Sequence, residues 1–454
     1  MNKKTWIILI LSALDAIAVA LGHNFYLTPV VIVGLLLFIG IIAVNDIKLI
    51  LPLMLFFLPW ATIMKVNPGT FSFFSLVSIL ILTRLVIKSR KLNNLNAMVA
   101  GLLLIAMIVL TSVARAEAIP TAFIRFSMVL LMLTWYISDK DNYPDFEVCT
   151  LFYSAGMLLA SGTAYLLLAS PGMQRFINIT NYANLKVTRL AGFNPDPNYF
   201  AMQVLLAVVC LFVLSNHTRS NLIKMLQFAA IGCLLFFGFT TVSKMFLISL
   251  IMIGLVWFIG MLTSRNDFSQ KATVILLVAA LLTVIVSTQM FSDMIDEYLK
   301  RFAQVTNVSS LTTGRSDLQT FYIKYIFKNI DVLLCGVGFG LKYPVGALNN
   351  VHNTPIDFIY RMGVIGTILF ITWFLSIFKQ ASLKVKMLFE KKLQFLIVLL
   401  GLFMPWMALD VLGGDEFFYY LTLLIFAYNY LKIQQNNELA SIPGNTSRRK
   451  PVKD

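Results

Sequence analysis

Long apolar runs follow one another along almost the whole chain, and they constrain its fold more than any other feature. Runs of about 17–22 residues recur, the length that an α-helix needs to cross roughly 30 Å of hydrocarbon. Hydrophobic residues make up 59% of the 454 residues and charged residues only 13%, which leaves too little polar surface for a soluble protein of this size. The sequence therefore predicts an all-α, polytopic helical membrane protein with about 12–14 transmembrane helices.

The hydropathy pattern also predicts how the chain is divided. We expect residues 1–291 to hold about eleven spans and a polar loop over 170–196, followed by a large loop over 292–353, C-terminal spans over 354–432 and a disordered polar tail over 433–454. The first apolar run has no small-residue cleavage site, so we interpret it as a span rather than a signal peptide. The expected spans lie at about residues 5–21, 29–45, 47–63, 71–88, 97–114, 119–138, 149–169, 197–215, 222–239, 243–262, 272–291, 354–378, 393–409 and 415–432.

The distribution of positive charge predicts the orientation of the chain. With both termini in the cytoplasm, about 21 of the 36 lysines and arginines fall in cytoplasmic loops and about 12 outside, as the positive-inside rule requires. Cytoplasmic lysines facing anionic lipid head groups account for the net charge of +15, and no basic stripe interleaved with aromatic residues indicates a nucleic-acid partner.

The four cysteines have no paired spacing, so we expect neither a disulfide framework nor a zinc site.

Two polar segments then lie on the outer side, over residues 170–196 and 292–353. The second has about 60 residues, which is unusual for a connection without a function. Within it, the stretch from Asp317 to Ile330 can form an amphipathic helix that lies flat on the outer membrane surface. These two segments are therefore the expected location of the chemistry.

Three residues in these segments are the main candidates. Arg189 lies in a Pro- and Gly-rich stretch just before a span, where it either snorkels to the interface or binds an anion. Arg315 follows Gly314 and either pairs with Asp317 at a helix start or clamps phosphate oxygens. His352 ends the large loop and opens a span, either as a structural histidine or as a general acid or base.

Further candidates for the same anionic site are Lys244, Asn353 and Arg361. Lys244 opens a span on the outer side, Asn353 follows His352, and Arg361 lies four residues after Asp357, with which it can also form a neutral pair inside the membrane. The segment from Gly336 to Gly340 lacks the full spacing of a dinucleotide-binding loop, so we interpret it as a tight turn.

The order of these elements resembles the O-antigen ligase/polymerase superfamily of bacterial membrane glycosyltransferases. The resemblance rests on Arg189 to Asn198 before a span, Gly314-Arg315 at the start of the large loop, Gly336 to Gly340, His352-Asn353, and Arg361 to Gly366 in the following apolar helix. It covers roughly residues 180–375 with motifs, and the remainder of the chain only by hydropathy.

The resemblance implies a GT-C-like helical fold in the bacterial cytoplasmic membrane. It implies a metal-independent, inverting glycosyltransferase without a cofactor, which takes a glycan from an undecaprenyl-pyrophosphate-linked oligosaccharide donor on the extracytoplasmic face. Arg189 and Arg315 would bind the pyrophosphate, and His352 would stand at the acceptor hydroxyl. The acceptor would be a glycan or another lipid-linked unit, and membrane lipids and a chain-length regulator protein are the expected partners.

Three functions remain open at this point. A polymerase would join repeat units into O-antigen, capsular or exopolysaccharide, and frequent Ile, Lys, Asn and Phe residues, typical of a low-GC organism, favour it. A ligase would pass the glycan to a lipid, protein or wall acceptor by the same chemistry. A lipid-linked oligosaccharide flippase would concentrate its cations in a central cavity and often has two similar halves, whereas here the candidate site charges gather in outer loops and no internal repeat is visible.

Overall fold

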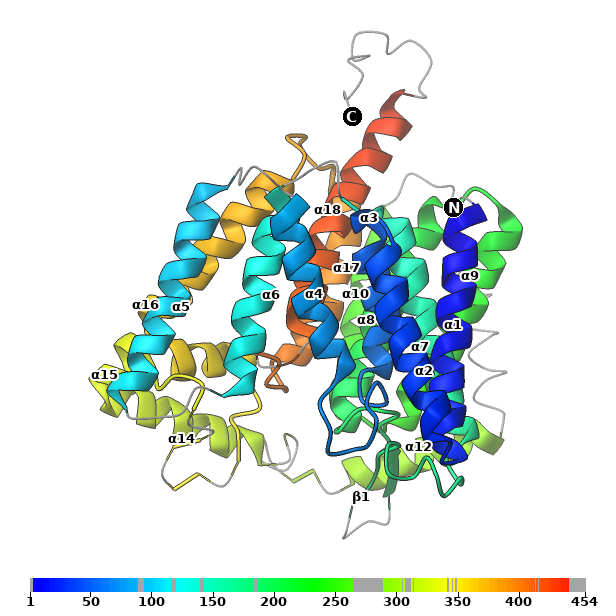
Figure 1. The fold of residues 1–454 in the computed structure, drawn as a ribbon, viewed down its shortest axis with the longest axis horizontal. Helices are drawn as coiled ribbons and strands as arrows, with labels where there is room; N and C mark the ends of the chain where they lie inside the picture. Colours follow the sequence, from blue (N-terminus) through cyan, green and yellow to red (C-terminus); the bar gives the residue numbers. More distant parts are fainter. Residues whose placement is uncertain are drawn as a thin grey trace.

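The structure is a computed structural model whose described residues form long helices and a two-stranded hairpin (Figure 1). The helices of the N-terminal part are α1 (Lys3–Asn24), α2 (Thr28–Val44), α3 (Ile47–Phe57), η1 (Leu58–Trp60), α4 (Phe73–Lys88), α5 (Leu95–Ala114), α6 (Thr121–Ser138) and α7 (Phe146–Leu166). The chain continues with β1 (Ile179–Tyr182), β2 (Val187–Leu190), α8 (Pro197–His217), α9 (Asn221–Thr240), α10 (Lys244–Thr263), α12 (Gln289–Phe302), α14 (Arg315–Lys328), α15 (Ile330–Cys335), α16 (Thr354–Ala381), α17 (Phe389–Trp406) and α18 (Glu416–Ala440). The described residues are 3–88, 94–115, 120–138, 143–182, 187–263, 289–303, 305–306, 312, 314–340, 343–344, 346–347, 349–412, 414 and 416–440.

Among the described residues, 8 helices are long and apolar enough to cross a membrane. They are α1, α5, α6, α7, α8, α9, α10 and α16. These helices lie where the apolar runs predict them, so the chain is a multi-pass helical membrane protein. The total of twelve to fourteen spans stays a prediction, because the span expected over 272–291 lies, apart from its end, outside the described residues.

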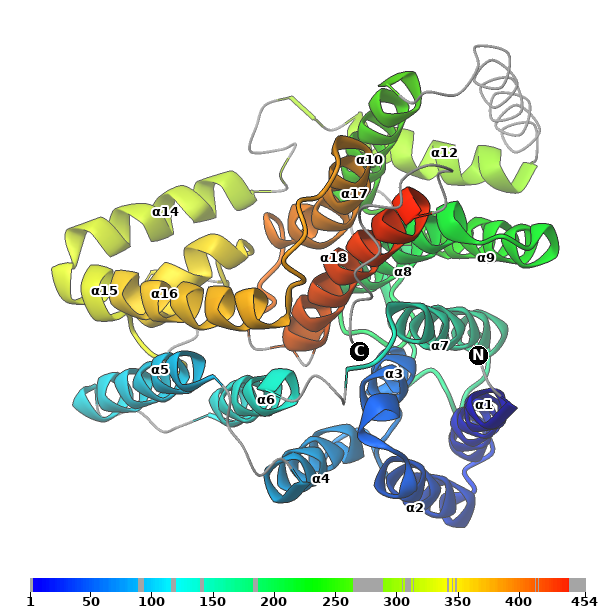
Figure 2. The same ribbon diagram turned by 90° about the horizontal axis from the view of Figure 1, so that it is seen from above.

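Helix α8 lies at the centre of the bundle when it is seen end-on (Figure 2). It packs against α7, α9, α10 and α17, and its side chains are buried along nearly its whole length. A helix that is apolar on all sides is either enclosed by other helices, as α8 is, or exposed to lipid. Pro197 opens α8 and Asp196 accepts the backbone N–H of Asn198 at 2.6 Å, so the sequence fixes where this central helix begins.

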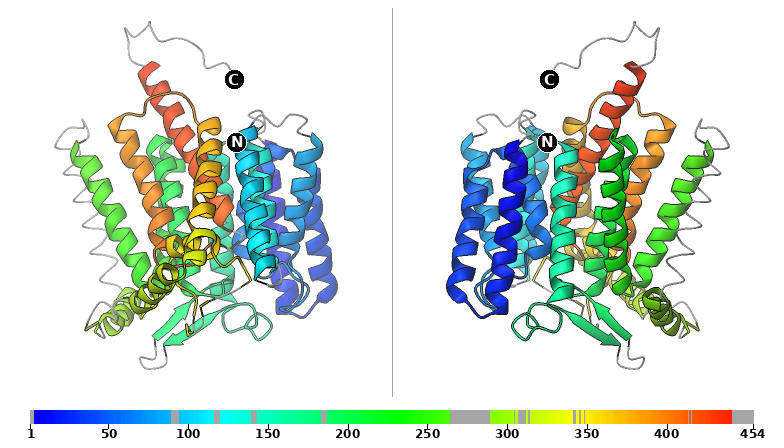
Figure 3. Two further views of the ribbon diagram at one scale, coloured as in Figure 1. Left: turned by 90° about the vertical axis from the view of Figure 1, so that its left-hand side faces the viewer. Right: turned by 90° about the vertical axis from the view of Figure 1, so that its right-hand side faces the viewer.

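The non-spanning elements gather at one end of the bundle. The hairpin, α12, α14 and α15 lie at the end opposite to the start of α1 and the last turn of α18 (Figures 1 and 3). The helix expected from Asp317 is confirmed as α14, whose Tyr322 and Ile326 are buried against α15 and α16 while Lys324 and Lys328 are exposed. These elements build a small folded layer on the membrane bundle.

Three details differ from the expectations. The segment over 170–196 contains an antiparallel hairpin that pairs Thr180 with Arg189, so the described chain is not purely helical. The boundary expected at residue 292 falls inside α12. The disorder expected over 433–440 is wrong, because α18 continues to Ala440 and is held by long-range polar contacts: Gln435 accepts the N–H of Leu388, and Glu438 pairs with Lys391, both at 2.7 Å. The rest of the expected tail, 441–454, lies outside the described residues.

A break within α16 docks the layer onto the bundle. Gly363 has φ +63°, and a Cβ atom there would lie 2.3 Å from the carbonyl oxygen of Leu334. The N–H groups of Val337 and Gly338 donate to the carbonyls of Tyr360 and Arg361 at 2.8 and 2.9 Å. The segment from Gly336 to Gly340 is therefore a turn that packs against α16, and the N–H groups of Val337 and Gly338 are hydrogen-bonded to that helix.

Candidate functional site

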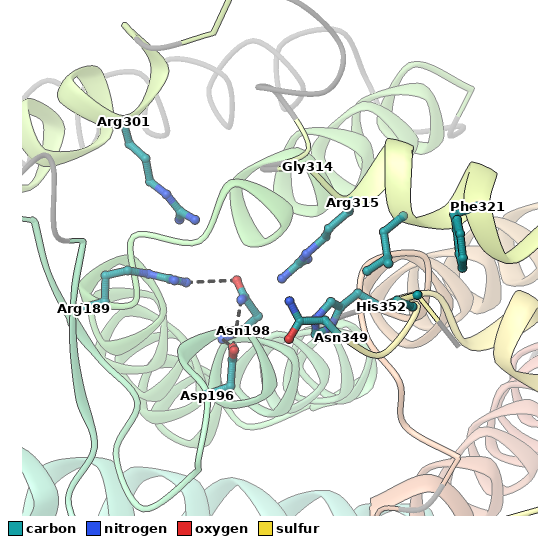
Figure 4. A pocket seen from close by; sticks show the side chains of 12 residues that line it. Arg189, Asp196, Asn198, Arg301, Gly314, Arg315, Phe321, Asn349 and His352 are labelled. Atoms are coloured by element: carbon teal, nitrogen blue, oxygen red, sulfur yellow. Dashed lines mark hydrogen bonds between the residues drawn. The ribbon is translucent and has the colours of Figure 1, made fainter. Parts of the chain in front are cut away.

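A cavity of about 550 Å³ lies where this end layer meets the bundle (Figure 4). Its walls come from β2, the start of α8, α12, α14 and the segment that leads into α16. The residues that line it are Arg189, Asp196, Asn198, Arg301, Gly314, Arg315, Leu318, Phe321, Gly346, Ala347, Asn349 and His352. Arg189, Arg315 and His352, the three main candidates from the sequence, are thus brought together.

Arg189 is fixed at the cavity by two hydrogen bonds. The residue is only 4% exposed. Its Nε donates to the carbonyl of Thr241 at 2.8 Å and its Nη2 donates to Oδ1 of Asn198 at 3.0 Å. Asn198 in turn accepts from Oγ of Ser243 at 2.8 Å and donates through Nδ2 to Asp196 at 2.8 Å. These bonds to the carbonyl of Thr241 and the side chain of Asn198 hold the guanidinium in one orientation.

A second buried arginine, Arg301 of α12, faces the same space. Its Nη1 donates to the carbonyl of Val242. Val242 follows Thr241, whose carbonyl accepts the hydrogen bond from Arg189. Val242 has φ +45°, which is a strained backbone for a β-branched residue. The turn between α9 and α10 therefore presents two consecutive carbonyls that orient two arginines, and strain of this kind clusters at functional sites.

Arg315 completes the cationic group from the opposite side. It opens α14, and its Nη1 donates to the carbonyl of Ala408 at 2.7 Å in the loop between α17 and α18. Figure 4 shows the guanidinium groups of Arg189, Arg301 and Arg315 directed from separate elements toward the same region around Asn198. Like charges are brought together here, an arrangement that an anionic ligand would stabilise.

His352 is held by Asp410 from the same loop between α17 and α18. The carboxylate of Asp410 accepts the backbone N–H groups of His352 and Asn353, each at 3.0 Å, and its Oδ2 lies 3.5 Å from Nδ1 of His352. His352 has φ +50°, a backbone conformation that costs energy and needs such support. Tyr199 of α8 donates to the carbonyl of Asp410, so the loop is anchored to the central helix.

The surroundings shift the proton affinities of this pair. Burial and the positive charge of Arg315 lower the pKa of His352, against a smaller opposite effect of Asp196. Burial raises the pKa of Asp410, partly offset by the two backbone N–H groups that it accepts. His352 is therefore neutral near pH 7 and can accept a proton. Its side chain is 34% exposed and that of Asp410 is 8% exposed, so the imidazole is the accessible member of the pair.

The cavity lining combines positive charge with an apolar side. Its described residues include three arginines and one aspartate, which carry a net charge of +2 with His352 neutral. Leu318 and Phe321 of α14 supply apolar surface beside Arg315. An anion that carries an apolar chain would match both sides.

The additional candidates do not line this cavity. Lys244 places Nζ 5.3 Å from the ring centroid of Phe302. Asn353 caps α16 by accepting the N–H of Ile356 at 3.1 Å. Arg361 binds Asp357 through Nε at 2.7 and 2.9 Å, which is the neutral pair that the sequence left open.

Sequence reasoning missed Arg301 and Asp410. Arg301 lies at the end of a segment rich in charged residues next to an expected span, and Asp410 lies at an expected span boundary in an otherwise apolar stretch. An isolated charge at such a boundary indicates a functional candidate, but neither position has a motif that distinguishes it from other interfacial charges.

Within the described part of the chain, no group of three or more His, Cys, Asp or Glu side chains is arranged to hold a metal ion. The chain matches no protein-family model, and no curated protein is significantly similar to it.

Proposed function

We propose that the chain is a membrane glycosyltransferase that polymerises undecaprenyl-pyrophosphate-linked oligosaccharide units on the extracytoplasmic face of the bacterial cytoplasmic membrane. The observation that carries the proposal is the convergence of Arg189, Arg301 and Arg315 on one cavity that also holds a neutral histidine. The order of motifs along the chain, which resembles the O-antigen ligase/polymerase superfamily, is its second support.

The charge and shape of the cavity support a lipid-linked donor. A pyrophosphate diester carries two negative charges, and the described residues of the lining carry a net charge of +2. Arginine binds phosphate oxygens through paired N–H groups, which fixes the orientation of the anion. Leu318 and Phe321 offer an apolar surface that the first isoprene units of the carrier can contact.

The reaction then follows from the residues that face the cavity. The hydroxyl oxygen of the acceptor sugar attacks the anomeric carbon of the donor from the side opposite the pyrophosphate, and the bond from that carbon to the pyrophosphate oxygen breaks. The neutral imidazole of His352 takes the hydroxyl proton. The arginines stabilise the negative charge that develops on the departing pyrophosphate. The products are a glycan joined to the acceptor with inverted configuration and prenyl pyrophosphate.

The location of the cavity favours transfer over transport. All three arginines belong to elements at one end of the bundle (Figure 1), whereas a transporter needs its binding groups near the middle of the membrane. The polymerase and ligase reactions share the donor site, so the identity of the acceptor distinguishes them.

Reconstitution tests the proposal directly. The purified full-length chain would be placed in vesicles with undecaprenyl-pyrophosphate-linked repeat units, with and without EDTA. The proposal predicts glycans of increasing length and stoichiometric release of undecaprenyl pyrophosphate in both samples. Unchanged single units, with lipid-linked units moved between leaflets instead, would favour a flippase. Release that depends on a non-carbohydrate or lipid A-type acceptor would favour a ligase.

A further inference from the structure

A second cavity of about 390 Å³ has Asp410 in its wall. Its walls come from the segment after η1, from α6, from the stretch before α8 and from the start of α18. Its polar lining includes Lys65, Arg125, Asn194, Tyr199, Asp410 and Glu416. A space of this size accommodates a small molecule or a few sugar rings.

The two cavities share two walls. Asp410 lines the second cavity, and its carboxylate holds His352, which lines the first. The stretch before α8 gives Asn194 to the second cavity and Asp196 to the first. The hydrogen-bonded His352–Asp410 pair therefore contributes one residue to the wall of each cavity.

The electrostatic character of the second cavity differs from that of the first. Lys65 and Arg125 carry two positive charges, and Asp410 and Glu416 carry two negative charges when ionised, so the described residues of this lining carry no net charge. A balanced set of strong donors and acceptors suits a neutral ligand with many hydroxyl groups, because each hydroxyl both donates and accepts. A pyrophosphate would gain far less here than beside the three arginines.

The polar groups of the second cavity are held in place by the central helix. Gln203 of α8, which is 1% exposed, accepts from Nδ2 of Asn194 at 2.9 Å and donates to Glu416 at 3.1 Å. Tyr199, one turn earlier, donates to the carbonyl of Asp410. Groups fixed by such partners before a ligand arrives favour specific binding.

We infer that the second cavity binds the terminal sugar of the acceptor, a neutral and hydroxyl-rich residue whose attacking hydroxyl reaches the His352–Asp410 pair. This inference rests on the proposed function, since it assigns the acceptor side of the same transfer. The donor glycan occupies the arginine-lined cavity, and the reacting atoms meet at the wall between the two.

Two variants of the second cavity test this assignment. Thr62→Trp fills the cavity, which Thr62 lines, with Thr62→Ser as its matched control. Lys65→Gln removes a donor charge with little change in size. Each full-length variant would be assayed with labelled, pre-extended glycans on undecaprenyl pyrophosphate as donor and unlabelled single repeat units as the varied acceptor. Binding of undecaprenyl pyrophosphate alone would be measured in parallel.

We expect both variants to raise the KM for the acceptor about tenfold or more. Lys65→Gln removes one charged hydrogen bond, and Thr62→Trp removes the space that the sugar occupies. Binding of undecaprenyl pyrophosphate should stay within about twofold of wild type, while Arg301→Gln should show the reverse pattern. A wild-type acceptor KM in both variants, or a parallel loss of undecaprenyl pyrophosphate binding, would overturn the inference. A wild-type chain that neither binds undecaprenyl pyrophosphate nor transfers glycan would instead refute the proposed function and, with it, this inference.

Discussion

The carboxylate of Asp410 accepts the backbone N–H of His352 at 3.0 Å and lies 3.5 Å from the imidazole Nδ1 of the same residue. The same loop offers the carbonyl of Ala408 to Arg315 at 2.7 Å. A short connection between α17 and α18 thus sets the positions of a candidate proton acceptor and a candidate phosphate ligand.

Asp410 should act through His352 as a positioning residue. We predict that Asp410→Ala lowers kcat for glycan transfer about 100-fold, because His352 loses the support for its strained backbone. Asp410→Asn, which keeps an acceptor oxygen, should restore part of the rate. The His352→Ala/Asp410→Ala double variant should be little slower than His352→Ala alone. Additive losses, measured in the same vesicle assay, would show that Asp410 acts independently of His352.

Arg301 should contribute to binding of the donor pyrophosphate. We predict that Arg301→Gln weakens the binding of undecaprenyl pyrophosphate by about 10- to 100-fold, as expected for the loss of a charged contact. Lys300→Gln is the matched control, since it removes the same charge from the neighbouring position, where the side chain is 54% exposed and pairs with Glu297. Titration of purified variants with undecaprenyl pyrophosphate checks this, and equal effects of the two substitutions would refute a specific role for Arg301.

The pH dependence of transfer should report the protonation of His352. The imidazole must be neutral to accept a proton, and its pKa lies below the ordinary value of 6.5. Activity should therefore be retained near pH 7 and fall as the pH drops through this lowered pKa. Asp196 raises the pKa of His352, so Asp196→Asn should move the acidic limb of the rate profile to lower pH. A limb that stays in place, or moves to higher pH, would contradict the assignment of this limb to His352.

The two glycines that join the end layer to α16 should be essential for stability. A Cβ atom at Gly336 would lie 2.4 Å from the carbonyl of Arg361, one at Gly363 would lie 2.3 Å from that of Leu334, and both residues have positive φ. We predict that alanine at either position destabilises the protein by about 2–4 kcal/mol. At Gly40 in α2 an added Cβ meets no atom within 4 Å, so Gly40→Ala should leave the melting temperature in detergent unchanged or slightly raised.

Much of the fold could be predicted because membrane helices are encoded locally. Length and apolar composition suffice to place α5, α9 and α10 within a few residues of their observed ends. The amphipathic pattern after Arg315 likewise predicted α14. The hairpin was missed because its four-residue strands have no alternating pattern long enough to distinguish them from a loop.

The site could be predicted only in part, because its geometry depends on contacts between distant residues. Arg189, Arg315 and His352 stood out because each lies in a distinctive local setting. Arg301 and Asp410 matter through partners 59 and 58 residues away, at Val242 and His352. No local pattern contains such a pairing, and a charge at a helix end has many structural explanations.

The central claim is that His352 serves glycan transfer in the arginine-lined cavity. The most direct measurement is the length of the surface glycan, read on a gel, in a deletion strain complemented with wild type, His352→Ala or His217→Ala. His217 is the control, because it lies at the far end of α8 and contacts Gln394 at 2.8 Å. We predict full-length polymer with wild type and His217→Ala, and only single repeat units with His352→Ala at equal expression. Full-length polymer with His352→Ala would contradict the account.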